Sequence, residues 1–521
     1  MTRLHVHTRE IEPHRPATIA RAVHFTLLRD GREEQLRNGA GVIYAPAAVG
    51  SDWRMQPQVL DDPRLTRRPK DWLLTVAISR TGEPEETSRR VGYRSQDLLE
   101  WDGPHPAAPF DESGTNTVDI DDATAAALEA KFGRIRSVAV DVDDSGPLSE
   151  RGATIRYSDG SSRRAKVDWD APALGRASGA IRIQDHAFPF IADRADPHIL
   201  EYDGRWLFVA TPDAGRGNEQ TPELFIRAAD TIEGLPAAPD HTIARVGDAG
   251  IGGCFWAPEL HTIAGELRIL FAPSIGTASW DGVQCHIMTL RPGGNPLDQG
   301  DWSAPAPVLT ADGHPLRADE RYGISLDMTY VPGDGGGHYV WSQRVVQDGY
   351  IGDAELWIAG VDPTDATRLR DEPRRLHTGR YSWELTDTNV VEGPFPLLSD
   401  DRLHLAYAAA AVGPHYATGW LSASTSDDPG DPSSWSVQPF PALDSASVPG
   451  QWGPGHISFF RHAGDTMMAF HAKIDPDETA RHTGIRRVHW AHNGLPVLDM
   501  TPEEDLHPDL RVVTTLIEGP S

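Results

Sequence analysis

Cysteine and long apolar runs are both scarce in this sequence. Only Cys254 and Cys285 occur among 521 residues, so two free buried thiols are favoured over a disulfide framework. No segment reaches the roughly 20 apolar residues that a membrane-spanning helix needs. The opening residues, MTRLHVHTREIEPHRP, lack the apolar core of a signal peptide. We therefore expect no membrane partner and a cytoplasmic location, or secretion if a leader was removed.

Basic residues are also few. The chain has 48 Lys and Arg against 76 Asp and Glu, which gives a formal net charge of −28. A chain this acidic repels polyanions, which argues against nucleic acid and anionic membranes as partners. Neutral carbohydrate remains compatible with this charge, and the composition leaves the oligomeric state unknown.

Glycine and proline, by contrast, are frequent and spread along the chain, with 49 and 42 residues. This composition favours many short strands joined by turns, hence an all-β protein. A short helix is expected to follow Asp121 and to end at Gly133. The sequence predicts four parts: an N-terminal β-module (1–110), a short helix with a small immunoglobulin-like β-sandwich (111–183), a larger β domain built of repeats (184–505) and a C-terminal tail (506–521).

One hairpin pattern occurs five times between residues 184 and 505. Its first copy is ADPHILEYDGRWLFVA, residues 195–210, in which Asp203-Gly204 closes a tight turn between two apolar runs. Each copy is followed by a second pair of short strands. Five units of about four strands at a near-constant period predict a five-bladed β-propeller. A series of β-sandwiches is the alternative, but it would not repeat unusual polar residues at one point of each unit.

Those repeated points carry the functional signal. The residues in question are spaced 60, 71, 65 and 64 positions apart: Asp196, Trp256, Asp327, Glu392 and His456. The innermost strands of a propeller converge on its axis, so three carboxyl groups would meet at one spot and shift one another's pKa values. Singly, each acid is more often a turn residue, and Trp256 and His456 are more often core residues. Together they indicate acid/base catalysis.

From about residue 184 to residue 500 the chain resembles glycoside hydrolase family 43. The resemblance lies in six segments that occur in order: FPFIADRADPHILEYDGRWLFVA, CFWAPELH, ISLDMTY, VVEGP, WGPGHISF and RHTGIRRVHW. It implies that Asp196 is the general base and Glu392 the general acid. Asp327 would tune the pKa of that acid and orient the substrate. His456 would lie beneath the site and help hold a central cation, usually calcium, mostly through water.

The resemblance also implies residues that contact the sugar. Arg481, nine residues before Trp490, would reach into the sugar pocket, which leaves Arg486 and Arg487 as surface or strand residues. Trp256 would offer a face for sugar stacking. Phe255 would alter a pocket wall, because the family more often has Ile, Met or Leu at that position.

The implied activity is that of an inverting exo-glycosidase. The foremost substrate is a terminal α-L-arabinofuranosyl residue of plant-type oligo- or polysaccharides. A β-xylosidase and a galactan-directed exo-enzyme are alternatives within the class. A non-catalytic sugar-binding propeller is the alternative of another class, against which the presence of all three acids argues. No organic cofactor is expected.

Overall fold

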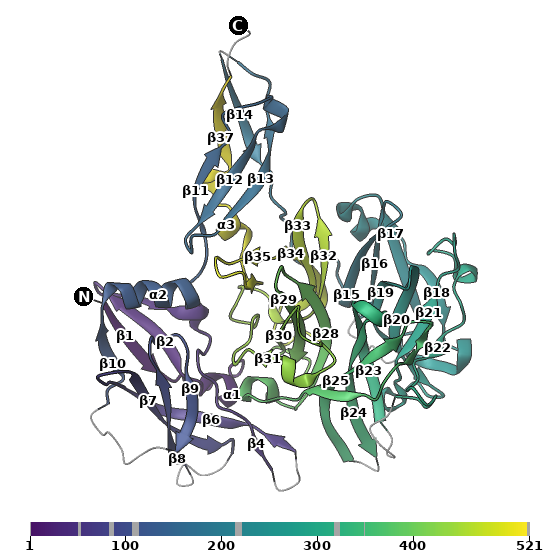
Figure 1. Ribbon diagram of the computed structural model, residues 1–521, viewed down its shortest axis with the longest axis horizontal. Helices are drawn as coiled ribbons and strands as arrows, with labels where there is room; N and C mark the ends of the chain where they lie inside the picture. Colours follow the sequence, from purple (N-terminus) through teal and green to yellow (C-terminus); the bar gives the residue numbers. More distant parts are fainter. Residues whose placement is uncertain are drawn as a thin grey trace.

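The computed structural model describes residues 2–50, 54–82, 88–106, 114–173, 175–213, 221–316, 323–347 and 350–517. Antiparallel sheets between residues 194 and 487 form the five blades of a propeller, as the repeat predicts (Figure 1). Blade one comprises β15 (Arg194–Tyr202), β16 (Arg205–Pro212), β17 (Glu223–Ala229) and β18 (His241–Arg245). Blade two comprises β19 (Ile251–Ile263), β20 (Glu266–Ile275), β21 (His286–Thr289) and β22 (Ala306–Pro307).

The other three blades follow the same plan. Blade three comprises β23 (Gly323–Val331), β24 (His338–Gln347), β25 (Tyr350–Asp362) and β26 (Asp365–Leu369), and β27 (Arg374–His377) pairs with β25. Blade four comprises β28 (Val391–Leu398), β29 (Arg402–Ala409), β30 (Ala417–Ser424) and β31 (Ser436–Val437). Blade five comprises β32 (Trp452–His462), β33 (Asp465–Lys473) and β34 (His482–Arg487), followed by the short pair β35 (His489–Trp490) and β36 (Pro496–Val497).

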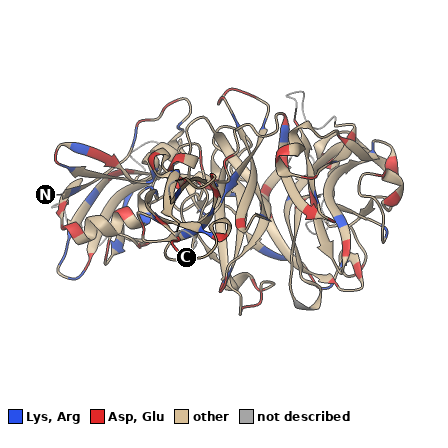
Figure 2. Ribbon diagram, turned by 90° about the horizontal axis from the view of Figure 1, so that it is seen from above, with Lys and Arg blue, Asp and Glu red and all other residues tan. Residues whose placement is uncertain are grey.

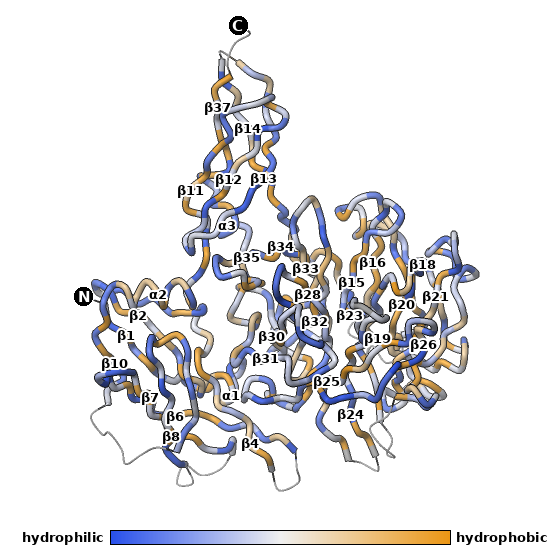
Figure 3. Tube along the Cα trace, viewed as in Figure 1, coloured by the Kyte–Doolittle hydropathy of each residue, from blue (hydrophilic) through white to orange (hydrophobic). Residues whose placement is uncertain are grey.

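The ring of blades closes on itself. Each innermost strand contacts the next, and β32 of blade five contacts β15 of blade one. The chain just before blade one adds to blade five, because Ile191 and Thr483 form a β-bridge. Apolar clusters fill the space between neighbouring blades: Phe255, Ile269 and Leu207 pack between blades one and two, for example. Figure 3 shows hydrophobic stretches along the strands and hydrophilic ones in many of the connections.

A β-bulge interrupts every innermost strand at the same level. The first residue within each bulge has a left-handed backbone, with φ between 45° and 54°: Asp196, Ala257, Asp327, Gly393 and His456. Such a backbone is costly for residues other than glycine and concentrates at functional sites. The bulges therefore mark the level at which the blades present side chains to the axis.

The N-terminal module is larger than the sequence predicts. One sheet has the order β10 (Thr117–Ile120), β1 (Thr2–His7), β2 (His24–Arg29) and β3 (Arg32–Gln35). A second comprises β6 (Gln58–Arg67), β7 (Trp72–Arg80), β8 (Arg89–Ser95) and β9 (Asp102–Pro106). The helix α2 (Asp122–Phe132) ends at Gly133 as expected. It packs Leu128 and Phe132 into the core of this module, so the expected boundary at residue 110 is too early.

The expected C-terminal tail is part of a sheet. Its residues form β37 (Val512–Leu516), which pairs with β14 (Arg176–Ile181). The series continues through β13 (Ser162–Trp169), β12 (Gly152–Tyr157) and β11 (Ser137–Val142). The described strands form one series in which β13 pairs with β12 through its first part and with β14 through its last part, and the expected immunoglobulin-like sandwich is not confirmed. This small sheet projects away from the propeller (Figure 1).

Two further elements join the parts. The helix α3 (Pro502–Asp505) precedes β37, and the helix α1 (Ala17–Ala20) lies between the N-terminal module and blade four. Acidic residues are spread over both the N-terminal module and the propeller (Figure 2). Among the described helices, none has the length and apolar character required to cross a membrane.

Candidate active site

The bulges correct the expected alignment of two residues. Trp256 and Glu392 each lie one position ahead of the bulge, opposite Ala272 and Ala408 of the neighbouring strand. The residues in register with Asp196 are Ala257 and Gly393. The acid on blade four therefore projects from a different position of its strand than the acids on blades one and three.

Asp196 is buried and surrounded by nitrogen atoms. Its Oδ1 lies 3.1 Å from an Arg481 terminal nitrogen, 3.0 Å from His471 Nδ1 and 3.3 Å from His456 Nδ1. Burial raises the pKa of Asp196, but Arg481, His456 and His471 lower it by a larger amount. The pKa therefore lies well below its usual value. Asp196 is thus ionised at neutral pH, the state that a general base requires.

Glu392 has the opposite tendency. Its side chain is only partly exposed and accepts a hydrogen bond from the hydroxyl of Tyr416, at 2.8 Å from Oε1. Its enclosed position raises the pKa of Glu392, and the negative charge of Asp196 adds to this rise, against the lowering effect of Tyr416 and His456. A carboxyl group with a raised pKa keeps its proton to higher pH, as a general acid requires.

Asp327 lies beside the acid's own backbone. Its Oδ2 accepts a hydrogen bond from the backbone N–H of Gly393 at 3.1 Å, so it fixes the residue that follows Glu392. Burial raises the pKa of Asp327 to about 8, with His456 lowering it and Glu392 and Asp196 raising it. The negative charge of Glu392 thus contributes to the raised pKa of Asp327.

His456 lies among the three carboxyl groups. Its Nδ1 is 3.3 Å from Asp196 Oδ1 and 3.8 Å from Asp327 Oδ2. Burial lowers the pKa of His456, but Asp196, Asp327 and Glu392 raise it, and the net change is upward. Gly393 makes this position possible, because a Cβ there would lie 3.0 Å from the His456 ring.

Arg481 reaches the site from the residue just before β34. Its Nε donates to Asp213 Oδ2 at 2.6 Å, and a terminal nitrogen donates to Asp196 Oδ1 at 3.1 Å. Arg486 and Arg487 are buried strand residues whose partners lie elsewhere, at Leu498 and Asp505. The count back from Trp490 therefore selects the arginine that contacts the expected base.

The two aromatic residues expected to contact sugar differ from each other. Phe255 is fully buried and stacks on Phe271, with ring centroids 6.2 Å apart. It is a core residue between blades one and two, so the expected pocket-wall role is wrong. Trp256 is partly exposed and packs against an apolar cluster that includes Ala272 and Leu326. Its role in stacking stays a prediction.

Three residues of this site were not expected from the sequence. Tyr416 bonds Glu392, His471 adjoins Asp196, and Asp213 holds Arg481. Burial and Arg481 lower the pKa of His471 to about 3, so its ring is neutral. His471 pairs in register with Gly455, which precedes the blade-five bulge. Searching each second strand for a polar residue opposite its bulge could have found it.

Comparison with known proteins assigns the chain to a family. The profile described as Glycosyl hydrolases family 43 matches residues 188–496, more than half of the sequence. The chain belongs to this family. An enzyme named extracellular exo-α-(1→5)-L-arabinofuranosidase from Streptomyces avermitilis is 29% identical over 320 residues, which cover 59% of this chain and 62% of the relative. The chain thus spans less than two thirds of that relative's length.

Two other relatives agree with the family 43 assignment. An enzyme of the same name from Streptomyces chartreusis is 30% identical over 288 residues, which cover 55% of this chain and 81% of the relative. A crystal structure of α-L-arabinofuranosidase from Lactobacillus brevis shares 28% identity and a TM-score of 0.52, and the match covers 60% of this chain and 96% of that one. Both Streptomyces enzymes are named extracellular, so they give no support to the expected cytoplasmic location.

The strand positions that follow the bulges carry groups that could surround a hydrated cation. The first paired residue after each bulge forms a ring below His456: His198, Glu259, Thr329, Phe395 and Ser458. The Glu259 carboxylate acts on His456 from this ring, and the buried Thr329 hydroxyl lacks a hydrogen-bond partner. Within the described ranges, no three His, Cys, Asp or Glu side chains converge to hold a metal directly. These donors suit an ion held largely by water.

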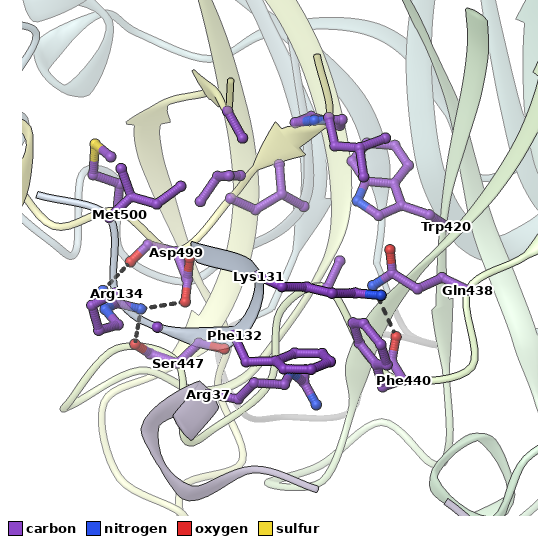
Figure 4. Close-up of a pocket in the computed structure, with 18 of the residues that line it drawn as sticks. Arg37, Lys131, Phe132, Arg134, Trp420, Gln438, Phe440, Ser447, Asp499 and Met500 are labelled. Carbon is purple, nitrogen blue, oxygen red and sulfur yellow. Dashed lines mark hydrogen bonds and ion pairs between the residues drawn. The ribbon is translucent and has the colours of Figure 1, made fainter. Parts of the chain in front are cut away.

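A separate cavity lies between the N-terminal module and the propeller. Its volume is about 190 Å³, and Phe132, Trp420 and Phe440 are among its lining residues (Figure 4). Arg134 beside it donates to Glu504 Oε1 at 2.6 Å and pairs with Asp499. None of the expected site residues lines this cavity. The ion pairs of Arg134 connect the N-terminal part of the chain to the segment that follows the propeller. We assign this cavity no part in catalysis.

Proposed function

We propose that this family 43 protein is an inverting exo-glycosidase that removes terminal α-L-arabinofuranosyl residues from oligosaccharides. The observation that carries the proposal is the opposite tuning of two acids at one spot. The pKa of Asp196 lies well below its usual value and that of Glu392 lies above it. Two carboxyl groups whose environments separate their pKa values are the arrangement that acid and base roles need.

The proposed reaction is a single displacement. Asp196 takes a proton from water as the water oxygen bonds the anomeric carbon of the terminal sugar. Glu392 gives its proton to the glycosidic oxygen as the bond from that oxygen to the anomeric carbon breaks. The sugar leaves with inverted configuration, and the rest of the chain leaves with a free hydroxyl. Asp327 positions Glu392 through its bond to the Gly393 N–H.

The choice of sugar rests on the relatives. The two Streptomyces enzymes are named for exo-acting cleavage of α-(1→5)-L-arabinofuranosides, and the chain shares about 30% identity with them. Arg481 donates a hydrogen bond to Asp196, and in this proposal its guanidinium also donates to sugar hydroxyls. A β-xylosidase, a galactan-directed enzyme and a sugar-binding propeller without activity remain the outcomes that a substrate screen would distinguish.

We further propose that calcium binds on the propeller axis near His456. The oxygen groups that would face its water shell are the Thr329 hydroxyl, which has no hydrogen-bond partner, and the Glu259 carboxylate, which also lies 2.7 Å from His261 Nε2. A bound cation would lower the repulsion among the carboxyl groups above it. Without a bound ion, a protonated His456 between Asp196 and Asp327 has the same effect. Beside a bound cation the His456 ring would be neutral.

Proton NMR of the reaction tests the proposed function. α-(1→5)-linked arabinotriose is mixed with the enzyme, and the anomeric signals are followed before mutarotation. The proposal expects β-L-arabinofuranose as the first product, with inversion at the anomeric carbon. Release of the α-anomer first would indicate retention and contradict the assigned roles. An enzyme that cleaves a nitrophenyl xyloside or galactoside but no arabinofuranoside would act on that sugar in place of arabinofuranose.

A further inference from the structure

A second polar pocket lies where the N-terminal module meets blades three and four. Its volume is about 350 Å³, within the usual range for small-ligand sites. The N-terminal module contributes Arg54, Met55 and residues 16–18, and the blades contribute Asp353 and the connection 385–389. It is thus a composite pocket that neither part forms alone. In Figure 1, α1 lies beside blade four at this junction.

The junction is held by direct hydrogen bonds. The hydroxyls of Thr18 and Thr386 are 2.8 Å apart, and the backbone N–H of Met55 donates to Asp353 Oδ2 at 3.0 Å. The backbone N–H of Ala47 donates to the carbonyl of Arg380 at 2.7 Å. Because these bonds fix both walls, the pocket has a defined shape.

One buried side chain of the pocket has unused hydrogen-bonding capacity. Asn389 is 5% exposed, and neither Nδ2 nor Oδ1 of its carboxamide has a hydrogen-bond partner. A buried amide without partners is costly, and Asn389 belongs to the pocket wall, so a ligand that can both donate and accept would satisfy it. Sugar hydroxyls do both.

The charge of the pocket fits a neutral ligand. Arg54 Nε lies 3.5 Å from Asp353 Oδ1, so the basic and the acidic group balance each other. Met55, Pro57 and Leu385 add apolar surface next to the hydroxyls of Thr18 and Thr386. This mixture of apolar and hydroxyl-binding groups is typical of a carbohydrate site.

The connection that lines the pocket leads into the strand that carries the general acid. Asn389 is three residues ahead of Glu392. Arg344 connects the two, because it donates to Thr388 Oγ1 at 3.3 Å and interacts electrostatically with Glu392, Arg54 and Asp353. A general acid protonates the oxygen of the leaving group, so the rest of the substrate must extend from that side.

From this geometry we infer that the pocket binds the leaving-group portion of an oligosaccharide substrate and that the N-terminal module supplies part of this subsite. The inference rests on the proposed glycosidase function. It assigns Asn389, Asp353 and Arg54 to substrate selection and leaves proton transfer to Glu392 and Asp196.

Two substrates separate this role from a structural one. The variants Arg54→Ala and Asn389→Ala are compared with Asn295→Ala, the same replacement at an exposed turn of blade two. The substrates are arabinotriose, whose leaving group is a sugar, and 4-nitrophenyl α-L-arabinofuranoside, whose leaving group is not. We expect kcat/KM on arabinotriose to fall about tenfold in each pocket variant, the loss expected for a missing hydrogen bond or charged contact. On the nitrophenyl substrate it should stay within twofold of the wild type.

Two results would overturn the inference: equal losses on both substrates in Arg54→Ala and Asn389→Ala, or no loss on either. If the wild type cleaves neither substrate, the proposed function fails on its own, and calorimetric binding of arabinotriose then decides about the pocket. Weaker binding to Arg54→Ala than to Asn295→Ala would retain the pocket as a sugar site. Equal binding to both variants would reject it.

Discussion

At the residue scale, the site depends on groups that hold Asp196 ionised. Arg481 is the foremost of them, because it contacts both Asp196 and Asp213 from one guanidinium. Burial lowers the pKa of Arg481, but Asp196 and Asp213 raise it above its usual value. The positive charge of Arg481 is therefore permanent, and the placement of its guanidinium between the two carboxylates determines how well it keeps Asp196 ionised.

Arg481→Lys should reduce kcat/KM by about tenfold or more although the charge is kept. A lysine ammonium is a single point and cannot bridge both carboxylates as the planar guanidinium does. Steady-state kinetics on 4-nitrophenyl arabinofuranoside measures the loss. Arg486→Lys is the control, since Arg486 bonds the Leu498 carbonyl away from the site. A larger loss of activity in the control than in Arg481→Lys would mean that Arg481 is not the sugar-site arginine.

Asp327 and Glu392 form the second pair at this scale. Burial and the charge of Glu392 raise the pKa of Asp327 to about 8. Above that pH, where Asp327 is itself ionised, the same repulsion acts on Glu392 in return and keeps its proton bound to higher pH. In Asp327→Asn this repulsion is gone, so the pKa of Glu392 should fall. Glu392 then loses its proton at lower pH, and the alkaline limb of kcat against pH should move to lower pH. An alkaline limb that stays in place or moves to higher pH would show that Asp327 does not tune the acid.

At the element scale, the connection before β28 places the acid. The helix η10 (Ser382–Leu385) carries Glu384, whose side chain is fully buried. Its carboxylate accepts from the hydroxyl of Tyr407 at 2.8 Å and lies 2.7 Å from His377 Nε2. It also accepts hydrogen bonds from the backbone N–H groups of Arg380 and Tyr381, both at 2.8 Å. This one side chain therefore anchors the segment that leads to Asn389 and Glu392.

Glu384→Ala should destabilise the propeller by about 3 kcal/mol or more, because several buried donors lose their acceptor at once. The measurement is the unfolding temperature of the full chain by calorimetry. Glu372→Ala, at an exposed position of the same blade, is the matched control and should have little effect. Equal unfolding temperatures for the two variants would show that the Glu384 network does not hold the connection.

The inner strands also show what sequence could predict. Repeated tight turns identified the blades, and the turns at Asp203-Gly204, Ala264-Gly265 and Ala463-Gly464 all have positive φ at both residues, as in type I′ hairpins. The bulges were not predictable from the sequence, because the residues before them share no residue type that would mark their position. Glu392 was therefore found by its motif and assigned one position away from its actual register. Tyr416 was missed because only the fold brings its segment to the site.

At the scale of the whole molecule, strand pairing between distant segments sets the domain boundaries, which the sequence alone could not predict. The C-terminal segment has the alternating pattern of a strand, but only its pairing with β14, more than 300 residues earlier, makes it part of a sheet. The same holds for β10, which pairs with β1 and extends the N-terminal module past residue 110. Local patterns predict strands, whereas domain boundaries depend on which strands meet.

The closed ring of blades is the setting for the proposed calcium ion. An ion bound only by the folded propeller stabilises it. Treatment with EDTA should therefore lower the unfolding temperature and activity of the wild type, and added Ca²⁺ should restore both. His456→Ala should respond less to EDTA, because part of the ion's surroundings is missing. A wild type that retains its unfolding temperature and activity in EDTA, and contains no calcium by elemental analysis, would reject the ion.

The central claim is that Glu392 donates the proton and Asp196 activates water. A nitrophenolate leaves readily without a proton, whereas a sugar hydroxyl does not. The decisive measurement is kcat/KM of Glu392→Ala and Asp196→Ala on both arabinotriose and 4-nitrophenyl arabinofuranoside. General acid and base groups each contribute about 10²–10⁴-fold. We predict that Glu392→Ala loses most activity on arabinotriose and retains a larger share on the nitrophenyl substrate, and that Asp196→Ala loses activity on both equally. Leaving-group dependence in Asp196→Ala alone would reverse the roles, and full activity in both variants would contradict the account.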